Sequence, residues 1–426
     1  MNTRWCALAG ALAVLLVSPA APASSPPDSA QVRADLLATE VLAVHPDLAA
    51  LQAAVAEAGH RQQLAGALPD PRLDLAFAPD TVGGYIAPGG NPRSLATSVR
   101  LSQRFPWPGT LRLAKNGAQQ DRLAQQEALA DQRLEMAALT RAAYARWVFL
   151  HQALDINQRS LDLLADLRAV SERRYGSGLD GQQDVLRIAI QSAARERARL
   201  HLEHRRHEVR AQLNALRQRA PDAPLAPPAR WAPAVDLPPL SALNRLALSN
   251  HPRLRAAEAR VDGARVDSLL AAKDFFPDFE LSVGHSEMQI VPEVRTTLGA
   301  SLNLPFGQGK RRAAQDAAEA AVAGAQSVLA SRRSELLSRL EQAYAKAVDA
   351  DRAIALIDTR WLPRSREALA ASRGLFAAGG GDFRTVIEAE EALLEAELER
   401  ARSAADGFVA RAWITRWSGA TNEESP

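Results

Sequence analysis

Four segments of the chain alternate apolar and polar residues, which is the pattern of a β-strand whose two faces meet different surroundings. They span residues 72–77, 95–105, 279–283 and 294–304. In the last segment, VRTTLGASLNL, most even-numbered residues are apolar and the odd-numbered residues are polar or glycine. We therefore expect four strands in two pairs, each strand with one apolar and one polar face.

Two long stretches carry a helical pattern instead. Residues 109–220 contain no proline, a run of 112 residues (220 − 109 + 1) dominated by the strong helix formers Ala, Leu, Arg, Gln and Glu. Apolar residues at heptad spacing in this run predict a narrow coiled-coil seam: Trp147, Leu150, Leu154, Leu161 and Leu164. On the helices alone, an ordinary antiparallel coiled coil without a transport role is the simpler interpretation.

Each long stretch is expected to form a helical hairpin. The first helix runs from Thr110 to Tyr175, which spans roughly 100 Å at the rise of an α-helix, and YGSGLDG then turns the chain back. In the second stretch a helix runs from Lys310 toward Phe376, turns at residues 379–381 and returns through residues 388–411. Pro363 lies inside this helix and should break or kink it.

The two halves of the sequence resemble each other. With a shift of 206 residues (251 − 45), His45 falls on His251 and Pro46 on Pro252, and the match continues into the first strand of each half. Each half has the order short helix, strand, loop, strand, long hairpin. We assign residues 24–220 and 241–426 to two structural repeats and the proline-rich residues 221–240 to an extended connector.

The first 23 residues have the features of a cleaved signal peptide: Arg4, an apolar core and then Ala21-Pro22-Ala23. We expect export with cleavage after Ala23. Cys6 is the only cysteine and precedes the apolar core, so it is not a lipid-modified first residue and the mature chain has no thiol.

The composition, the net charge and the absence of several motifs exclude some classes of function. Hydrophobic residues make up 47% and charged residues 23% of the 426 residues, which is typical of a folded protein. Without the leader, 50 basic and 49 acidic residues leave a net charge of +1, so nothing indicates a nucleic-acid partner. The sequence has no CxxC, phosphate loop, GxSxG or HExxH motif, so we expect no catalytic residues, no metal site, no cofactor and no enzyme.

The strands determine the interpretation of the fold. A sheet packed on a globular core also alternates, and for a single strand that is the more common case. However, strands of about ten residues, in an exported chain without an apolar run of about 18 residues, match the pattern of a transmembrane β-barrel. Four strands cannot close a barrel, so they must be pooled among subunits. The residues assigned to lipid are Leu73, Leu75, Val99, Leu101, Leu281, Val283, Leu298 and Leu302.

Several motifs then resemble those of a known family, the TolC-type outer-membrane factors. They are FPWPG and LPFGQG, which lead from strand into helix, and the hairpin tips YGSGLDGQQDVLRI and FAAGGGDFRTVIEAEEALLEAE. The resemblance implies a mainly α fold with a small β part: a homotrimer with a twelve-stranded barrel in outer-membrane lipid and an α-barrel of coiled-coil hairpins in the periplasm. It also implies a periplasmic adaptor (membrane fusion protein) and an inner-membrane RND-type transporter as partners.

The resemblance also implies functional residues at the hairpin tips. Asp184 and Glu388 align with the family's gate aspartates, the second with glutamate in place of aspartate, and Arg384 is a candidate for the gate arginine. Gly178 and Leu179, with Gly379 and Gly380 at the second tip, correspond to the site where the adaptor docks. The alternatives are carboxylates favoured by a helix dipole and glycines that cap a helix.

The function implied is that of an exit duct of a tripartite efflux pump, which conducts substrate passively from periplasm to exterior through a gated periplasmic end. FPWPG and the compact length resemble the heavy-metal branch, so metal cations are the expected cargo. His285, Glu287 and Met288 are a weak candidate for a metal cluster and more typical of solvated polar residues. A drug-efflux or type I secretion duct and a soluble periplasmic coiled-coil adaptor or scaffold are the alternatives.

Overall fold

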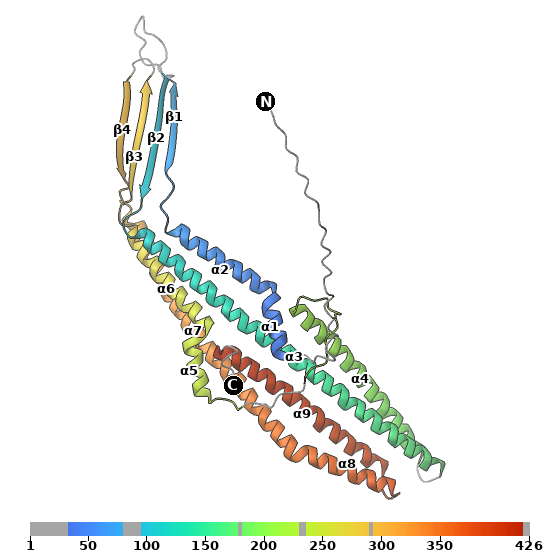
Figure 1. Ribbon diagram of the computed structural model, residues 1–426. Helices are drawn as coiled ribbons and strands as arrows, with labels where there is room; N and C mark the ends of the chain where they lie inside the picture. Colours follow the sequence, from blue (N-terminus) through green and yellow to red (C-terminus); the bar gives the residue numbers. More distant parts are fainter. Residues whose placement is uncertain (1–32, 80–94, 178–180, 230–235, 289–292, 421–426) are drawn as a thin grey trace, which may run out of the picture.

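The protein is a long, narrow molecule with a β-sheet at one end and two helical hairpins at the other (Figure 1). The computed structural model describes residues 33–79, 95–177, 181–229, 236–288 and 293–420. In this part of the chain, helices dominate and one antiparallel sheet of four strands accompanies them. The predicted fold class, mainly α with a small β part, is confirmed.

The two halves follow the same order of elements. The first half contains α1 (Ala34–Val44), α2 (Pro46–Ala65), β1 (Arg72–Pro79), β2 (Leu95–Phe105), α3 (Thr110–Gly176) and α4 (Gln182–Leu216). The second contains α5 (Leu240–Asn250), α6 (Pro252–Lys273), β3 (Phe279–Met288), β4 (Glu293–Leu302), α7 (Gln308–Leu356), a π-helical turn η1 (Ile357–Trp361), α8 (Leu362–Ala377) and α9 (Phe383–Ser418).

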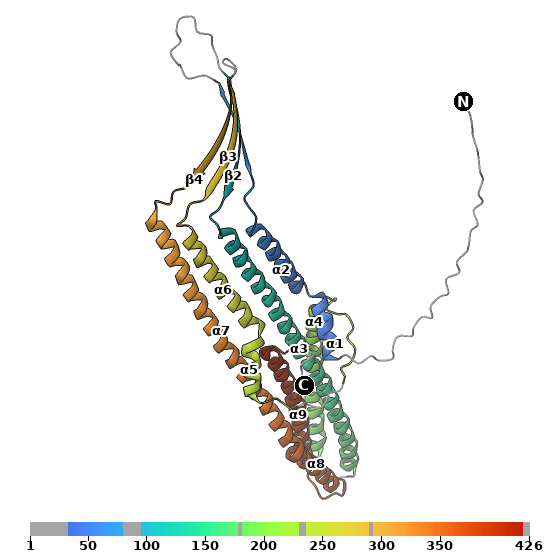
Figure 2. The ribbon, with the colours of Figure 1, turned by 60° about the vertical axis from the view of Figure 1, so that its left-hand side comes forward.

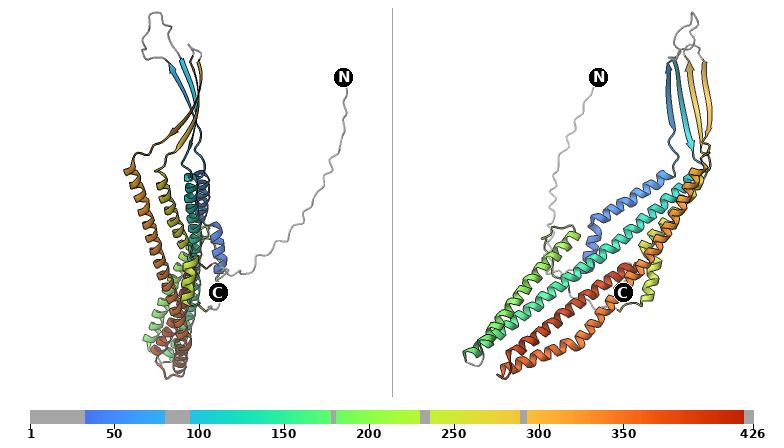
Figure 3. Two further views of the ribbon diagram at one scale, coloured as in Figure 1. Left: turned by 90° about the vertical axis from the view of Figure 1, so that its left-hand side faces the viewer. Right: turned by 180° about the vertical axis from the view of Figure 1, so that it is seen from behind.

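The helices and strands form one curved layer. The strand order is β1-β2-β3-β4, and the helices that lead into or out of these strands pack in the corresponding order α2, α3, α6, α7. Figure 2 shows each strand as the extension of one of these helices. Farther from the sheet, α4 packs on α3, and α9 lies between α3 and α7, while α8 continues α7 and packs on α9. The edge-on view in Figure 3 shows how thin this layer is.

The helix expected before the first strand of each half is divided in two. A proline disfavours helical geometry in the residue before it, and His45 and His251 both have extended backbones, with ψ of 125° and 124°. Each histidine caps the following helix, because its Nδ1 accepts the backbone N–H two residues later, from Asp47 at 3.3 Å and from Arg253 at 3.1 Å. The paired His-Pro motifs therefore form the same local structure twice.

Pro363 alters the helix without breaking it. Proline has no N–H to donate to the carbonyl four residues back, and its ring would clash with that carbonyl. The turn just before it, η1, is π-helical, with the Leu362 N–H donating to the Ile357 carbonyl five residues back. The chain remains helical from α7 into α8 and changes direction there (Figure 1), so the expected kink is present and the break is not.

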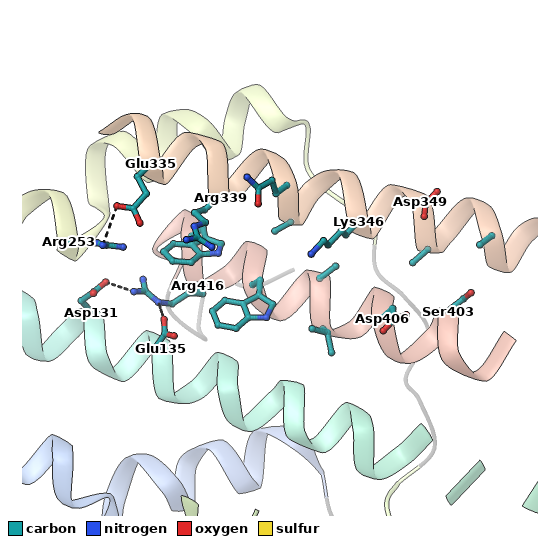
Figure 4. Close-up of a pocket in the computed structure, with 18 of the residues that line it drawn as sticks. Asp131, Glu135, Arg253, Glu335, Arg339, Lys346, Asp349, Ser403, Asp406 and Arg416 are labelled. Carbon is teal, nitrogen blue, oxygen red and sulfur yellow. Dashed lines mark hydrogen bonds and ion pairs between the residues drawn. The ribbon is translucent and has the colours of Figure 1, made fainter. Parts of the chain in front are cut away.

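A buried arginine ties α9 to α3 in the middle of the layer. Arg416 is only 3% exposed and pairs with Asp131 at 2.7 Å and Glu135 at 2.8 Å, both on α3. Figure 4 shows its guanidinium between these two carboxylates, at one end of a hollow lined by α3, α7 and α9. Removing one partner of such a cluster leaves a buried charge uncompensated, which costs several kcal/mol.

His251 is fully buried beside this cluster. Its Nδ1 accepts the Arg253 N–H, and its Nε2 lies 3.2 Å from the Arg416 carbonyl oxygen and 3.0 Å from the Arg416 Nη1. Burial first, and then the Arg416 guanidinium, lower the pKa of His251 from 6.5 to about 3. The ring is therefore neutral in the folded protein.

We expect His251 to make the stability of the protein depend on pH. The unfolded chain binds a proton at this ring below about pH 6.5 and the folded chain only near pH 3, so stability falls as the pH falls through this window, by up to about 1.4 kcal/mol per pH unit. His251→Asn keeps an acceptor for the helix cap and should flatten this pH dependence of the thermal unfolding midpoint. The matched change His45→Asn, at the partly exposed copy, controls for the loss of a capping histidine. Equal slopes in the wild type and His251→Asn would contradict the assignment.

Candidate functional site: the sheet face and the helical tips

The apolar face of the sheet is the exposed one. All eight residues assigned to lipid lie exposed, from Val99 at 38% to Leu298 at 82%. The opposite, polar face is more covered, and Ser102 on it is buried. A sheet that packs on a globular core shows the reverse. In the described part of the chain, the sheet makes its main contacts among its own strands, so no helix covers the apolar face.

The register builds this face from rows that cross all four strands. Leu73 lies opposite Leu101, Leu101 opposite Val283, and Val283 opposite Leu298. Because residues directly opposite each other share a face, the row is a continuous apolar band. The adjacent row is polar and points to the other side: Asp74, Arg100, Gly284 and Thr297.

The sheet also has two open edges. Strands β1 and β4 each pair with a single neighbour, so one side of each carries backbone N–H and C=O groups that no described strand satisfies. No described helix is long and apolar enough to span a membrane.

The helical tips share one apolar core. Leu167 of α3, Ile188 of α4, Phe376 of α8 and Phe383 and Val386 of α9 are buried together there. The rings of Phe376 and Phe383 meet edge to face with 5.7 Å between centroids. The two hairpins therefore share a core at the end of the molecule, where the rear view in Figure 3 shows them side by side.

Of the three gate candidates, the structure brings Arg384 and Glu388 together. The Arg384 Nε lies 3.6 Å from a carboxylate oxygen of Glu388, one turn later on α9, and both side chains are more than 60% exposed. They line a shallow hollow with Arg187 and Gln191 of α4. Asp184 is the third residue of α4 and belongs to the same helix face as these two, at i+3 and i+7.

The carboxylate that caps α9 is one that sequence reasoning missed. Asp382 precedes the helix, and its Oδ1 accepts the Arg384 N–H at 3.1 Å. An aspartate directly before a helical pattern is a typical N-cap signal and could have identified it. Glu388, the sixth residue of α9, lies beyond the first turn, so the helix-start alternative fits Asp184 and Asp382 better than Glu388.

The glycines of the second tip have a structural role, because they end α8. Gly379 has a φ of +88°, and the N–H groups of Gly379 and Gly380 donate to the carbonyls of Phe376 and Leu375, both at 3.1 Å. This is a Schellman motif, in which the residue after the cap is usually glycine. A Cβ on Gly380 would meet no atom within 4 Å, so that position is open. Gly178 and Leu179 lie outside the described residues.

A buried glutamate above the tip core was also missed. Glu390 of α9 is 3% exposed and accepts a hydrogen bond from the Ser160 hydroxyl of α3. Arg195 of α4 approaches its other oxygen at 3.5 Å. Glu390 follows Phe383 and Val386 at core spacing, where the periodicity predicts an apolar side chain, so only the structure identifies this link among three helices.

The weak metal candidate forms no cluster. His285 and Glu287 are exposed near the end of β3, on the apolar face of the sheet. The side chain of Met288 is not among those that the structure describes. Across the described ranges, no three His, Cys, Asp or Glu side chains are grouped as metal ligands.

Comparison with known proteins identifies the family. The model of the family described as outer membrane efflux protein matches residues 37–218 and 243–416. No curated protein matches the chain in sequence.

Solved structures of similar fold cover almost the whole chain. The outer-membrane channel OprN is 20% identical over 94% of this chain and 95% of that chain, with a TM-score of 0.78. VceC from Vibrio cholerae is 19% identical over 91% and 96% (TM-score 0.78), and CusC is 18% identical over 92% and 93% (TM-score 0.79). These identities show a shared fold, and the resemblance to TolC-type outer-membrane factors is confirmed. With both of its halves matched by the family model, the chain belongs to the outer membrane efflux protein family.

Proposed function

We propose that three copies of this chain form the outer-membrane exit duct of a tripartite efflux pump. The sheet lies in the outer membrane, the helices extend into the periplasm, and substrate passes through the tube to the exterior without chemical change. The observation that carries this proposal is the exposed apolar face of β1 to β4. The family is one of channel proteins and the chain is not an enzyme.

The open edges of the sheet favour the trimer. In a lipid bilayer each unsatisfied backbone group costs several kcal/mol, so β1 and β4 must pair with strands from other copies. Three copies of the four-stranded sheet supply twelve strands, which exceeds the roughly eight that a closed barrel needs. Because helix order follows strand order, the same three copies also extend the helical layer into a periplasmic tube.

The tips are then the gated end of the tube. Asp184, Glu388 and Arg384 are proposed to hold it closed through polar contacts between neighbouring hairpins. The adaptor is proposed to dock beside Gly178 and Leu179 at one tip and Gly379 and Gly380 at the other. The capping role of Gly379 is compatible with docking, because it fixes the shape of the turn that the adaptor meets.

Metal cations are the proposed cargo, because FPWPG resembles the motif of the heavy-metal branch. An RND-type transporter in the inner membrane is proposed to supply the energy for export. Ducts for drugs or for type I secretion have the same architecture and are the alternatives for the cargo. A soluble periplasmic scaffold is disfavoured, because it would leave the Leu73–Leu101–Val283–Leu298 band in water.

We expect Leu298→Arg to impair insertion into the membrane and Thr297→Arg, on the opposite face, to be tolerated. An arginine facing lipid near the bilayer midplane costs about 2 to 4 kcal/mol. Urea titration of folding into lipid vesicles measures the difference. Equal stability of the two variants, or recovery of the wild type from the soluble periplasmic fraction without detergent, would contradict the lipid-facing assignment.

The trimer is testable by cross-linking, since the mature chain is expected to lack cysteine. A chain with Ala76→Cys on β1 and Thr297→Cys on β4, both on the polar face, treated with a flexible bis-maleimide, should give dimers and trimers and nothing larger. Ser98→Cys with Ser286→Cys is the control, because these residues are direct partners within one sheet and should link internally. A monodisperse monomer by light scattering in detergent would rule out pooled strands.

Replacing the gate carboxylates should open the tube. The double variant Asp184→Asn with Glu388→Gln is expected to raise single-channel conductance in planar bilayers and to reduce cation selectivity, because a ring of carboxylates attracts cations. The matched control is Glu172→Gln with Glu367→Gln, two exposed carboxylates that pair with arginines of their own helices. If the gate variant stays trimeric with wild-type conductance and selectivity, Asp184 and Glu388 do not gate the tube.

A further inference from the structure

We propose that the surface where the sheet meets the helices binds the phosphate groups of anionic phospholipids in the inner leaflet of the outer membrane. This junction surface comprises residues 66–71, 106–115, 270–278 and 303–312. The inference rests on the proposed function, because it needs the sheet to lie in lipid.

Basic residues are concentrated on the junction surface. Its cations are Arg112, Lys115, Lys273, Lys310, Arg311 and Arg312. Its carboxylates are Asp70, Asp274 and Asp278, and Asp278 is already paired with Arg104 of β2. Six cations therefore face two uncommitted carboxylates. The chain has four lysines in total, and three of them lie here, so the excess is local in a chain that is otherwise nearly neutral.

These cations lie at one level of the molecule. Lys273 is the last residue of α6, Lys310 is the third of α7, and Arg112 and Lys115 are the third and sixth of α3. At 1.5 Å per residue, all are within about 9 Å of the helix ends that adjoin the sheet. Figure 1 shows these helix ends together at the base of the strands.

Most of these cations have no carboxylate partner in the described part of the chain. Arg112, Lys115, Lys310 and Arg312 are exposed, and none of them forms one of the ion pairs that join other arginines to acids. The first turns of α3 and α7 contain no acidic residue. Cations near the start of a helix are unfavourable next to its partial positive charge, so an external anion would stabilise this arrangement.

Apolar groups lie directly beside the cations and continue the lipid-facing surface of the sheet. Trp107 stacks on Phe276 and Phe279 at 4.9 and 5.6 Å, and these phenylalanines remain 45% and 37% exposed. The Lys273 Nζ lies 5.6 Å from the Phe276 ring centroid. Phe306, four residues before Lys310, is 83% exposed.

This order, apolar sheet face, aromatic rings and then cations, follows the profile of a bilayer from acyl chains to headgroups. Aromatic rings favour the boundary region, and long basic side chains extend to the phosphates while their stems stay in apolar surroundings. Each basic residue close to an anionic membrane surface contributes about 1 kcal/mol of binding, a factor of about five. Charge complementarity and continuity with the sheet face thus point to phospholipid headgroups.

The test titrates the detergent-solubilised full-length protein with short-chain phosphatidylglycerol and with phosphatidylcholine, followed by native mass spectrometry. The wild type should bind the anionic lipid at least ten-fold more tightly. The triple variant Lys310→Gln, Arg311→Gln and Arg312→Gln should lose most of this preference, with up to about 100-fold weaker binding of phosphatidylglycerol. The matched control is Arg197→Gln, Arg205→Gln and Arg373→Gln, which removes three exposed cations far from the sheet and should keep the preference.

Three outcomes would overturn the proposal. They are equal binding of the two lipids by the wild type, an unchanged preference in the triple variant, and displacement of phosphatidylglycerol by millimolar inorganic phosphate, which would indicate a site for a free anion. If the triple variant instead loses its trimer with unchanged lipid affinity, a neighbouring subunit covers the surface and the proposal also fails. Failure of the duct itself is distinguishable, because the wild type would then partition into the soluble fraction.

Discussion

The structure depends on one constraint: every strand is the continuation of a helix, so the same side-by-side order holds from the sheet through the adjoining helices. A layer one element thick cannot bury both of its faces, and its edges have no partners within the chain. In the proposed duct, lipid covers the apolar side chains of the sheet, and strands of further copies pair with the backbone groups at its edges. The chain thus has the shape of one segment of a tube. The open edges of β1 and β4 are where the next segments would pair, and the apolar face of the sheet is where the tube would meet the membrane.

A single layer also has little apolar core, and polar links compensate for this. Arg416 binds two carboxylates of α3 in the middle of the molecule, and Glu390 joins α9 to Ser160 of α3 and Arg195 of α4 nearer the tip. Buried charges of this kind are expensive to desolvate, and we infer that these ones act by fixing the register of the helices. Between long helices rich in alanine, where many registers pack almost equally well, directional links select one.

Periodicity identified most of the fold, and it failed where a local or tertiary effect overrode it. The long helices were predictable, since Thr110–Tyr175 differs from α3 by one residue, because a proline-free run of helix formers has no competing structure. The division of the first helix into α1 and α2 at His45 was not predicted, although Pro46 indicates a helix boundary at the residue before it. At the tips, the pairing of Arg384 with Glu388 follows from their i,i+4 spacing. The burial of Glu390 does not follow from any spacing, because it depends on Arg195, a residue 195 positions away.

The two halves share their helix caps but differ in how their long helices reach the tip. In the first half α3 is a single α-helix, whereas in the second the π-turn before Pro363 separates α7 from α8 and changes their direction. Beyond this bend, Phe376 of α8 and Phe383 of α9 lie in the apolar core that both hairpins share at the tip. The duplication therefore provides two matching units, and the departure from it at Pro363 changes the direction of the second hairpin before it reaches the tip.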